Sequence, residues 1–416
     1  GVFAPTIRYN NGRFYMVTTN DTTHRNFYVY TDDIHGEWSD PITIDQDGID
    51  PSLYFEDGRA FFISNGTDCE GRGGVVQCEI NIETGEKLTE SRCIWQGSGG
   101  RYLESPHMYK IGKYYYLMAA EGGTEYGHMI TYARSESVWG KFEGYPHNPV
   151  LTNRNKAPFI IQGIGHGDLI QDKNGEWHII CLGFRQIHMW MTYHHLGREC
   201  FLIPVTFHED GWFTAGNGTC EESYELSGDF AQLPLKTYTL ENIGHDICHL
   251  RHPHTENYSI TKDKITLKGT DVTLDDVASP TFAGVRQRDF DMDCSVSVSV
   301  SDGEGGLTVY SCETEHYDLA LRKNEGGYEA ILRLNIGGIR HIEKAVQIPS
   351  GDAKLIIRSD SQVYKFFVQS QGEEIPMGFA MSKYLSSEVC GGFTGTVIGM
   401  YAVKGSAEFT DLRISY

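Results

Sequence analysis

The first half of the chain alternates apolar and polar residues in short runs that tight turns separate. Such runs begin at residues 4–9, 50–55, 105–109 and 167–170, and each leads within a few positions to a second alternating run. Asn11-Gly12, Asp57-Gly58 and Asn174-Gly175 lie between three of these pairs. Because such dipeptides tolerate the positive φ angles of two-residue hairpin turns, the pattern predicts a hairpin that recurs four times.

The recurrence has a period of roughly 45 to 60 residues, which is typical of propeller blades. Further strand-like runs lie at residues 27–30, 74–80 and 129–134, and no sustained helical periodicity appears between them. A propeller closes only when its first and last blades meet. Since four blades are visible and the chain starts at Gly1 inside one of them, we expect that a blade and any targeting signal lie upstream of this sequence.

The sequence pattern changes near Glu222, where the aromatic hairpin repeat stops and a linker-like Ser227-Gly228-Asp229-Phe230 follows. We therefore predict two domains, a propeller at residues 1–222 and a second domain at residues 223–416. The second domain has short, alternating strand-like runs at residues 294–300, 307–311, 328–334, 354–358, 363–369, 397–402 and 407–414. This pattern favours a β-sandwich that resembles a lectin-like jelly roll.

The charge balance limits the classes of binding partner that this protein can have. Lys and Arg number 35 against 56 Asp and Glu, a formal net charge of −21. This excess argues against nucleic acid and against an anionic membrane surface, and no apolar run reaches the roughly 18 residues of a membrane helix. We expect a neutral ligand.

The cysteines and the glycosylation tripeptides bear on the compartment. The ten cysteines contain no CxxC pair, so free thiols and a cytoplasmic location are expected. Asn-x-Ser/Thr tripeptides begin at Asn20, Asn65, Asn217 and Asn257, but they indicate nothing without a secretory signal.

Polar residues recur where the innermost strands of successive blades start. They are Asp50 before Pro51, Glu104 before Ser105, and His166 in Gly165-His166-Gly167. Propellers bind ligands at the mouth of the central channel, so two carboxyls and an imidazole are expected to converge there. Glycoside hydrolysis needs a carboxylic acid that protonates the leaving oxygen and a carboxylate that activates water or attacks the sugar. Capping of strand edges is the alternative interpretation, which the shared register makes less attractive.

Five phrases in order resemble glycoside hydrolase family 43, in particular its β-xylosidases and α-L-arabinofuranosidases with a C-terminal sandwich domain. They are residues 3–9, 49–53, 104–107, 165–169 and 196–199, and the tail at residues 391–395 also looks like that group. The resemblance implies an all-β fold, with a five-bladed β-propeller whose first blade is largely missing here, followed by the lectin-like β-sandwich.

The resemblance also implies catalytic roles. Glu104 matches the general acid, and Asp50 matches the carboxylate that raises the pKa of the acid and orients it. The reaction would invert the anomeric carbon. The family's general base is an Asp of the first blade, so we expect it upstream of Gly1 and assign it to no residue here.

Four residues match the family's substrate-binding positions. Arg185 resembles the arginine of the pocket floor, with a surface arginine at a strand end as the alternative, and Phe3 stands where many relatives have Trp. Ile49 belongs to the same phrase as Asp50. Phe393 looks like the residue that walls off the pocket, which would favour action at chain ends.

His166 resembles the histidine that in many relatives helps to bind a calcium ion or a water cluster on the channel axis. Calcium prefers oxygen ligands, so a shell of one His and waters would be unusual. A channel histidine that only makes hydrogen bonds is the alternative. No cofactor is required.

The sequence therefore predicts a hydrolase that removes terminal xylose or arabinose from xylo-oligosaccharides or arabinoxylan. The alternative is a carbohydrate-binding protein without catalysis, because the base is unassigned. A third possibility, a retaining sugar-cleaving propeller, would place its carboxylates in other phrases. The choice between xylose and arabinose stays open, and so does a homo-oligomer, which relatives with this sandwich often form.

Overall fold

The computed structural model describes residues 1–187, 190–226 and 235–416 of the chain. Contacts divide it into two compact units, Gly1–Phe184 with Glu199–Phe230, and Arg185–Arg198 with Ala231–Tyr416. No feature of the sequence pattern indicated that a segment inside the propeller half would join the second unit. The predicted linker Ser227-Gly228-Asp229-Phe230 lies outside the described residues.

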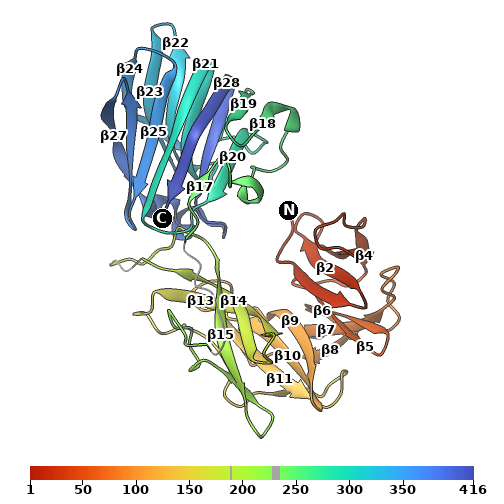
Figure 1. Cartoon of the computed structure of the whole chain (residues 1–416). Helices are drawn as coiled ribbons and strands as arrows, with labels where there is room; N and C mark the ends of the chain where they lie inside the picture. Colours follow the sequence, from red (N-terminus) through yellow and green to blue (C-terminus); the bar gives the residue numbers. More distant parts are fainter. Residues whose placement is uncertain (188–189, 227–234) are drawn as a thin grey trace. The chain divides into compact units, whose positions relative to one another are not determined.

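The first unit contains four four-stranded antiparallel sheets, in which chain order and spatial order agree (Figure 1). The first two sheets are β1 (Thr6–Asn10), β2 (Arg13–Asn20), β3 (Arg25–Thr31) and β4 (Ile42–Ile44), then β5 (Ser52–Glu56), β6 (Arg59–Thr67), β7 (Gly73–Ile80) and β8 (Arg92–Trp95). The next two are β9 (Glu104–Ile111), β10 (Tyr114–Glu121), β11 (Met129–Ser135) and β12 (Glu143–Gly144), then β13 (Ile161–Gln171), β14 (Trp177–Arg185), β15 (Glu199–Phe207) and β16 (Phe213–Ala215). The predicted propeller blades are confirmed.

The blades pack face to face through aromatic and aliphatic side chains. Tyr115 faces the preceding blade in a cluster with Phe61 and Trp95, whereas Tyr116 faces the following blade in a cluster with Phe213. This opposite placement of neighbouring residues follows from the two-residue period of a strand. The consecutive tyrosines Tyr114, Tyr115 and Tyr116 therefore form packing surface between blades.

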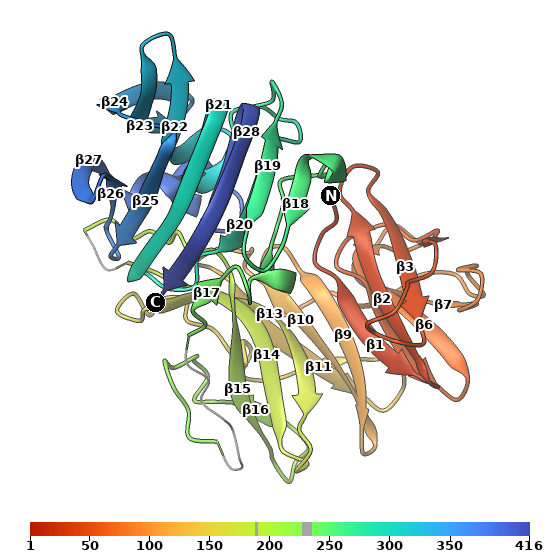
Figure 2. The ribbon, with the colours of Figure 1, turned by 45° about the horizontal axis from the view of Figure 1, so that its top comes forward.

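The first strands of the blades lie next to one another in chain order. β1 contacts β5, β5 contacts β9, and β9 contacts β13. In Figure 2 the labelled first strands β1, β9 and β13 follow one another from red to yellow-green. The starts of these strands therefore meet around one axis, which positions the candidate site.

The second unit is a sandwich built on one strongly bent, twelve-stranded sheet. Its strands are β17 (Tyr238–Thr239), β18 (Tyr258–Ile260), β19 (Ile265–Gly269), β20 (Thr281–Arg286), β21 (Met292–Cys312), β22 (Glu315–Asn324), β23 (Gly327–Ile336), β24 (Ile339–Ile348), β25 (Asp352–Ser359), β26 (Val363–Ser370), β27 (Glu373–Met381) and β28 (Val397–Ser415). The short helices are η1 (Gly244–Asp246), η2 (Thr255–Asn257), η3 (Ser382–Leu385) and α1 (Ser387–Cys390). One large apolar core lies between its layers. The predicted β-sandwich is confirmed.

Two pairs of predicted strands are single long strands in the structure. Residues 294–300 and 307–311 both belong to β21, and residues 397–402 and 407–414 both belong to β28. The pairing of β21 with β28 shifts register around Asp302. There Gly303 has φ 72°, and a Cβ on it would lie 1.2 Å from the Lys404 carbonyl oxygen. The glycine thus bends the ladder without ending it, whereas its sequence signal is that of a turn.

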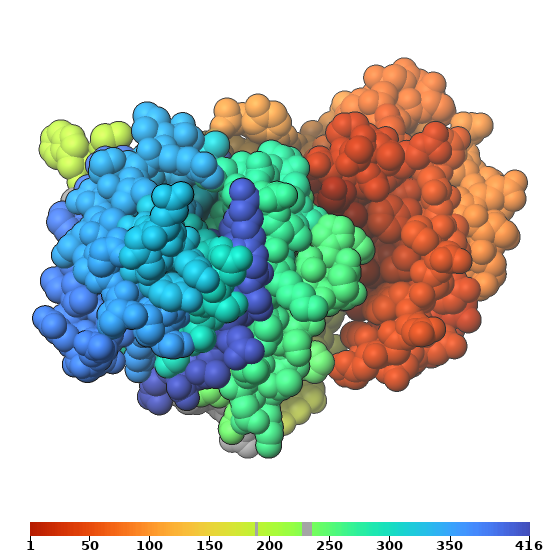
Figure 3. All heavy atoms as spheres, turned by 90° about the horizontal axis from the view of Figure 1, so that it is seen from above, coloured from red at the N-terminus to blue at the C-terminus, as the bar shows by residue number. Residues whose placement is uncertain are grey.

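Strand β24 was missed because most of its side chains are exposed, so that its sequence lacks a buried alternation. The blue atoms of the later sandwich strands form much of the surface seen in Figure 3.

No helix among the described residues is long and apolar enough to cross a membrane.

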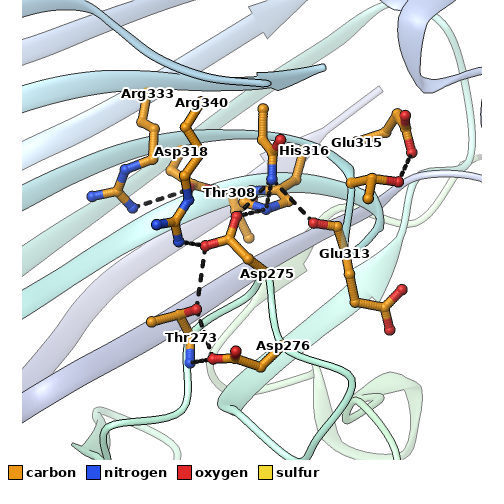
Figure 4. Close-up of polar contacts among 12 residues, drawn as sticks. Thr273, Asp275, Asp276, Thr308, Glu313, Glu315, His316, Asp318, Arg333 and Arg340 are labelled. Carbon is orange, nitrogen blue, oxygen red and sulfur yellow. Dashed lines mark hydrogen bonds and ion pairs between the residues drawn. The ribbon is translucent and has the colours of Figure 1, made fainter. Parts of the chain in front are cut away.

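A buried polar network lies on the outer face of β21, β22 and β23 (Figure 4). Asp318, whose side chain is 1% exposed, accepts hydrogen bonds from Thr308 at 2.8 Å and His316 Nδ1 at 2.9 Å. Arg333 donates to it at 3.2 Å and holds Glu304 with both terminal nitrogens, at 3.0 and 2.7 Å. Burial alone would raise the pKa of Asp318, but His316, Arg333 and Thr308 together hold it below its ordinary value.

We expect that Asp318→Ala destabilises the sandwich by about 3–5 kcal/mol, because it leaves the buried Thr308 and His316 donors without their acceptor and removes one of the two carboxylates that pair with Arg333. Urea unfolding measured through the sandwich transition checks this. The matched control is Glu408→Ala, which removes an exposed pair with Lys264 at 2.9 Å and should change stability by less than about 1 kcal/mol. Equal effects of the two variants would contradict the prediction.

Candidate active site

The three predicted site residues lie at the inner ends of neighbouring blades. Asp50 precedes β5, Glu104 is the first residue of β9, and His166 lies within β13. Glu104 is close enough to Asp50 for its charge to act on the pKa of that carboxyl, and His166 Nδ1 lies 3.9 Å from Asp50 Oδ2. The structure therefore brings all three together, as the repeat register predicts.

The Asp50 carboxyl lies in a place that disfavours its charged form. Burial, followed by the charge of Glu104, raises its pKa to about 7, although the Ser105 backbone N–H opposes the shift. The Asp50 carboxyl therefore keeps its proton up to about neutral pH, next to Glu104. Burial likewise lowers the pKa of His166 to about 4, so that its imidazole is neutral beside the pair.

The backbone at the site is strained. Asp50, Ser105 and His166 have φ angles of 51°, 56° and 47°, in the left-handed region that side chains with a Cβ rarely occupy. Such residues cost about 1–3 kcal/mol each and persist only where the surroundings hold them. Their gathering around one pair of carboxyls marks this place as functional.

Asn65 of β6 joins the two loops that carry the carboxyls. Its Oδ1 accepts the Ile49 N–H at 3.2 Å, and its Nδ2 donates to the Leu103 carbonyl at 2.6 Å. The Asn65 backbone packs so closely on Gly48 that a Cβ there would lie 1.3 Å from the Asn65 carbonyl oxygen. Since Ile49 and Leu103 directly precede Asp50 and Glu104, Asn65 sets the spacing of the pair.

A second buried network lies behind His166. Arg8 of β1 donates to both carboxylate oxygens of Asp168, at 2.7 and 3.0 Å, and to His107 Nδ1 at 3.0 Å. Tyr109 donates a further hydrogen bond to Asp168. Burial would raise the pKa of Asp168, but His107, Arg8 and Tyr109 lower it to about 2. The axis thus holds an ionised, fully paired carboxylate in addition to the Asp50 carboxyl, whose pKa is raised.

His128 lies fully buried against Glu104. Because a carbonyl can only accept, its Nδ1 donates to Gly163 O at 3.1 Å, which leaves Nε2 with a lone pair in the neutral ring. Nε2 lies 3.7 Å from Glu104 Oε1 and has no hydrogen-bond partner in the described part of the chain. Gly165 makes room for the ring, since a Cβ there would lie 2.3 Å from it.

The predicted substrate-binding residues fall in both units. In the first, half-buried Ile49 adjoins Asp50, and Phe3 joins the edge of the first blade through its N–H to Thr19 O at 2.9 Å. In the second, Arg185 pairs with Asp289 at 3.1 Å. Phe393, 54% exposed, lies under the guanidinium of Arg198, whose Cζ is 4.3 Å from the ring centre. Their roles stay predictions.

The calcium ion predicted near His166 was tested against the side chains present. Among residues 1–187, 190–226 and 235–416, no group of three or more His, Cys, Asp or Glu side chains could hold a metal ion. Asp168, the neighbouring carboxylate of β13, already has Arg8 and Tyr109 on its oxygens. These side chains do not form the oxygen shell that calcium prefers. Calcium stays a prediction, and no reaction step below depends on it.

Several site residues carried no recognised sequence signal. Arg8 and Asp168 stand inside phrases that were identified, but their mutual pairing joins positions 160 residues apart. Asn65 was visible only as the start of a glycosylation tripeptide. Nothing in the pattern singled out His128, which precedes a strand as an isolated polar residue.

A propeller with two neighbouring carboxyls at its axis, one of them with a raised pKa, suits a glycosidase that protonates its leaving group. Comparison with known proteins agrees. Residues 1–213 match the model of glycosyl hydrolases family 43, and residues 236–413 match that of the β-xylosidase C-terminal concanavalin A-like domain. The chain belongs to glycoside hydrolase family 43 and is a hydrolase of its xylosidase and arabinofuranosidase group.

Individual relatives extend over nearly the whole chain. The non-reducing end α-L-arabinofuranosidase BoGH43B of Bacteroides ovatus is 37% identical over 97% of this chain and 78% of its own length. A xylosidase/arabinosidase of Butyrivibrio fibrisolvens is 30% identical over 97% of this chain and 82% of its own.

Solved structures agree with these relatives. The Bacteroides ovatus xyloglucan PUL GH43B structure has a TM-score of 0.91 at 35% identity, covering 100% of this chain and 86% of that one. The xylan β-1,4-xylosidase of Bacillus halodurans C-125 has a TM-score of 0.91 at 26% identity, covering 100% and 87%.

We expect Asp50→Asn to stabilise the propeller increasingly as pH rises. A carboxyl whose pKa is raised from 3.8 to about 7 on folding contributes stability at low pH that is lost as pH rises through 7. The neutral amide avoids this loss, so the advantage of the variant should grow by about 2 kcal/mol between pH 5 and 8. Urea unfolding at several pH values measures it. Asp57→Asn, in an exposed turn, is the control, and a difference that does not vary with pH would contradict the prediction.

We expect Asn65→Ala to lower kcat by about 10- to 100-fold while KM changes little, because the carboxyls lose their fixed spacing. Steady-state kinetics on a nitrophenyl pentoside measure both constants. Asn81→Ala serves as the control, because it removes a similar hydrogen bond, which the Glu83 N–H donates to the Asn81 side-chain oxygen at 2.9 Å. A change in KM alone, or equal losses in both variants, would show that Asn65 does not position the pair.

Proposed function

We propose that the protein removes terminal xylose or arabinose from xylo-oligosaccharides or arabinoxylan with inversion of configuration. The observation that carries the proposal is the placement of Glu104 beside the buried Asp50 at the propeller axis, where burial and the charge of Glu104 raise the pKa of Asp50 to about 7. A carboxyl that is still protonated at neutral pH is what protonation of a leaving oxygen needs.

In this proposal Glu104 gives the proton to the glycosidic oxygen, and Asp50 sets its protonation and orientation. Glu104 is the more accessible of the two, with a side chain that is 16% exposed against 9% for Asp50. Asp50 is also held from behind by the Ser105 N–H and lies beside neutral His166. Its role therefore suits the inner partner, which keeps the proton available without touching the leaving group.

The same displacement also needs a carboxylate that activates water on the opposite face of the sugar while the leaving oxygen is protonated. An inverting pair stands roughly 6.5 to 9.5 Å apart to admit that water. We assign this role to none of the described residues. Asp168 does not suit it, because Arg8 and Tyr109 occupy its oxygens.

The pentose specificity rests on relatives. Two relatives that cover 97% of this chain act, by their names, as α-L-arabinofuranosidase and as xylosidase/arabinosidase. We extend the same class of terminal sugars to this chain, with action at chain ends and Phe393 as its predicted determinant.

We expect the full-length natural protein to hydrolyse nitrophenyl β-xyloside or nitrophenyl α-L-arabinofuranoside. Glu104→Gln should lower kcat by about 10²- to 10⁴-fold, the range of a lost general acid. Proton NMR of the first product should show the anomer opposite to that of the substrate. Glu143→Gln, an exposed residue of β12, is the control.

Three results would contradict the proposal. A product that keeps the substrate's configuration would exclude inversion. An unchanged rate in Glu104→Gln would remove this residue as the acid. Binding of pentose oligosaccharides without any turnover would favour the carbohydrate-binding alternative.

A further inference from the structure

A groove of about 870 Å³ with a mixed polar and apolar lining lies in the propeller, apart from the carboxyl pair. Glycines form much of its wall, and the side chains that reach it include Arg101, Tyr126, Arg154 and Asn155. Ligand sites of this size typically hold a small molecule or a few units of a polymer. The reaction steps proposed above make no use of it.

The strand register places the groove relative to Glu104. Glu104 pairs with Ala120, Ala120 pairs with Ile130, and Ile130 bridges to Leu151, so that one row crosses the whole blade. The groove is lined by Gly122, Met129 and Arg154, which lie within a few positions of that row. At about 4.8 Å between strands, it extends from roughly 5 to 14 Å outward from the strand of Glu104.

The wall nearest to Glu104 is rigid. Glu121 is fully buried, and its carboxylate accepts the N–H groups of Ser98 at 2.7 Å and Gly100 at 2.5 Å. Thr131 donates a third hydrogen bond at 2.8 Å. The glycine loop is thereby fixed, and its bare backbone leaves the groove open.

The accessible side chains suit hydroxyl groups. Arg154 is exposed, and its Nη1 contacts the Met129 sulfur at 3.2 Å, with no ion-pair partner in the described parts of the chain. Arg101 is held by Glu125 and donates to Gly122 O at 3.2 Å. A guanidinium presents several donors in a fixed plane, which can bind adjacent sugar hydroxyls, and half-buried Tyr126 supplies an aromatic ring beside them.

We propose that this groove binds the sugar units on the leaving-group side of the scissile bond, with Arg154 as a main determinant. The inference rests on the proposed function, because it takes Glu104 as the acid. An acid must contact the oxygen that leaves, so the departing chain emerges next to the acid. The groove on the same blade, one strand outward from Glu104, is therefore where that chain continues.

The test compares substrates of different length in the full-length natural protein. For Arg154→Ala we expect kcat/KM for xylotetraose, or for its arabinosylated form, to fall about tenfold, because a charged hydrogen bond to the chain is lost. On the nitrophenyl pentosides, which have no further sugar units, kcat/KM should stay within about twofold. Arg92→Ala is the matched control. Arg92 is also an exposed arginine, but it begins β8 in another blade and does not line the groove.

Binding gives a second readout that needs no turnover. In the Glu104→Gln background, calorimetry with xylobiose, xylotriose and xylotetraose, or with their arabinosylated forms, should show affinity that rises with length. Arg154→Ala should abolish this rise, and Arg92→Ala should preserve it.

The outcomes separate the two proposals. Equal losses on short and long substrates, or no loss on either, would contradict sugar binding in the groove and would not affect the proposed hydrolase activity. If the natural protein hydrolyses no pentoside, the proposed function fails, and the calorimetric series alone decides the groove. Affinity that does not depend on length, or on Arg154, would overturn it there.

Discussion

The site depends on keeping two carboxyl groups close together where water cannot solvate two negative charges. Burial and the charge of Glu104 raise the pKa of Asp50 to about 7, so the folded protein holds a proton that the unfolded chain would release. This arrangement opposes folding above neutral pH, and the surrounding structure has to sustain it. The strained φ angles of Asp50, Ser105 and His166 add to the same cost.

What sustains it is the propeller itself. Each inner strand starts at the axis, and the blades behind it pack through large, fully buried clusters. Asn65 ties the loop of Asp50 to that of Glu104, and Ser52 donates to the Pro106 carbonyl at 2.6 Å across the same two blades. A rigid frame thus fixes the distance between the carboxyls, which neither loop could do alone.

The sequence allowed part of this to be predicted, for a physical reason. Asp50 and Glu104 could be found because the hairpin repeat gives every blade the same register, and residues at one register position meet at the axis. Asn65 and His128 could not, because each acts through the loop or ring of another blade or strand, and such partnerships leave no periodic trace. The same limit applies to the sandwich, where Gly303 reads as a turn although the Lys404 backbone packed against it keeps β21 continuous.

The axis also keeps two kinds of acid apart. Asp168 is ionised because Arg8 and Tyr109 satisfy its oxygens, whereas Asp50 has only one backbone donor and a neighbouring carboxyl. Between them stand His107 and His166, with ring centres 6.3 Å apart, and burial keeps both neutral by lowering their pKa values to about 3 and 4. Because neither ring is positively charged near neutral pH, neither favours loss of the proton from Asp50 beside Glu104. The axis thus holds two different carboxyl environments: an ionised Asp168 that is paired with Arg8, and an Asp50 that burial and the charge of Glu104 keep protonated up to about neutral pH.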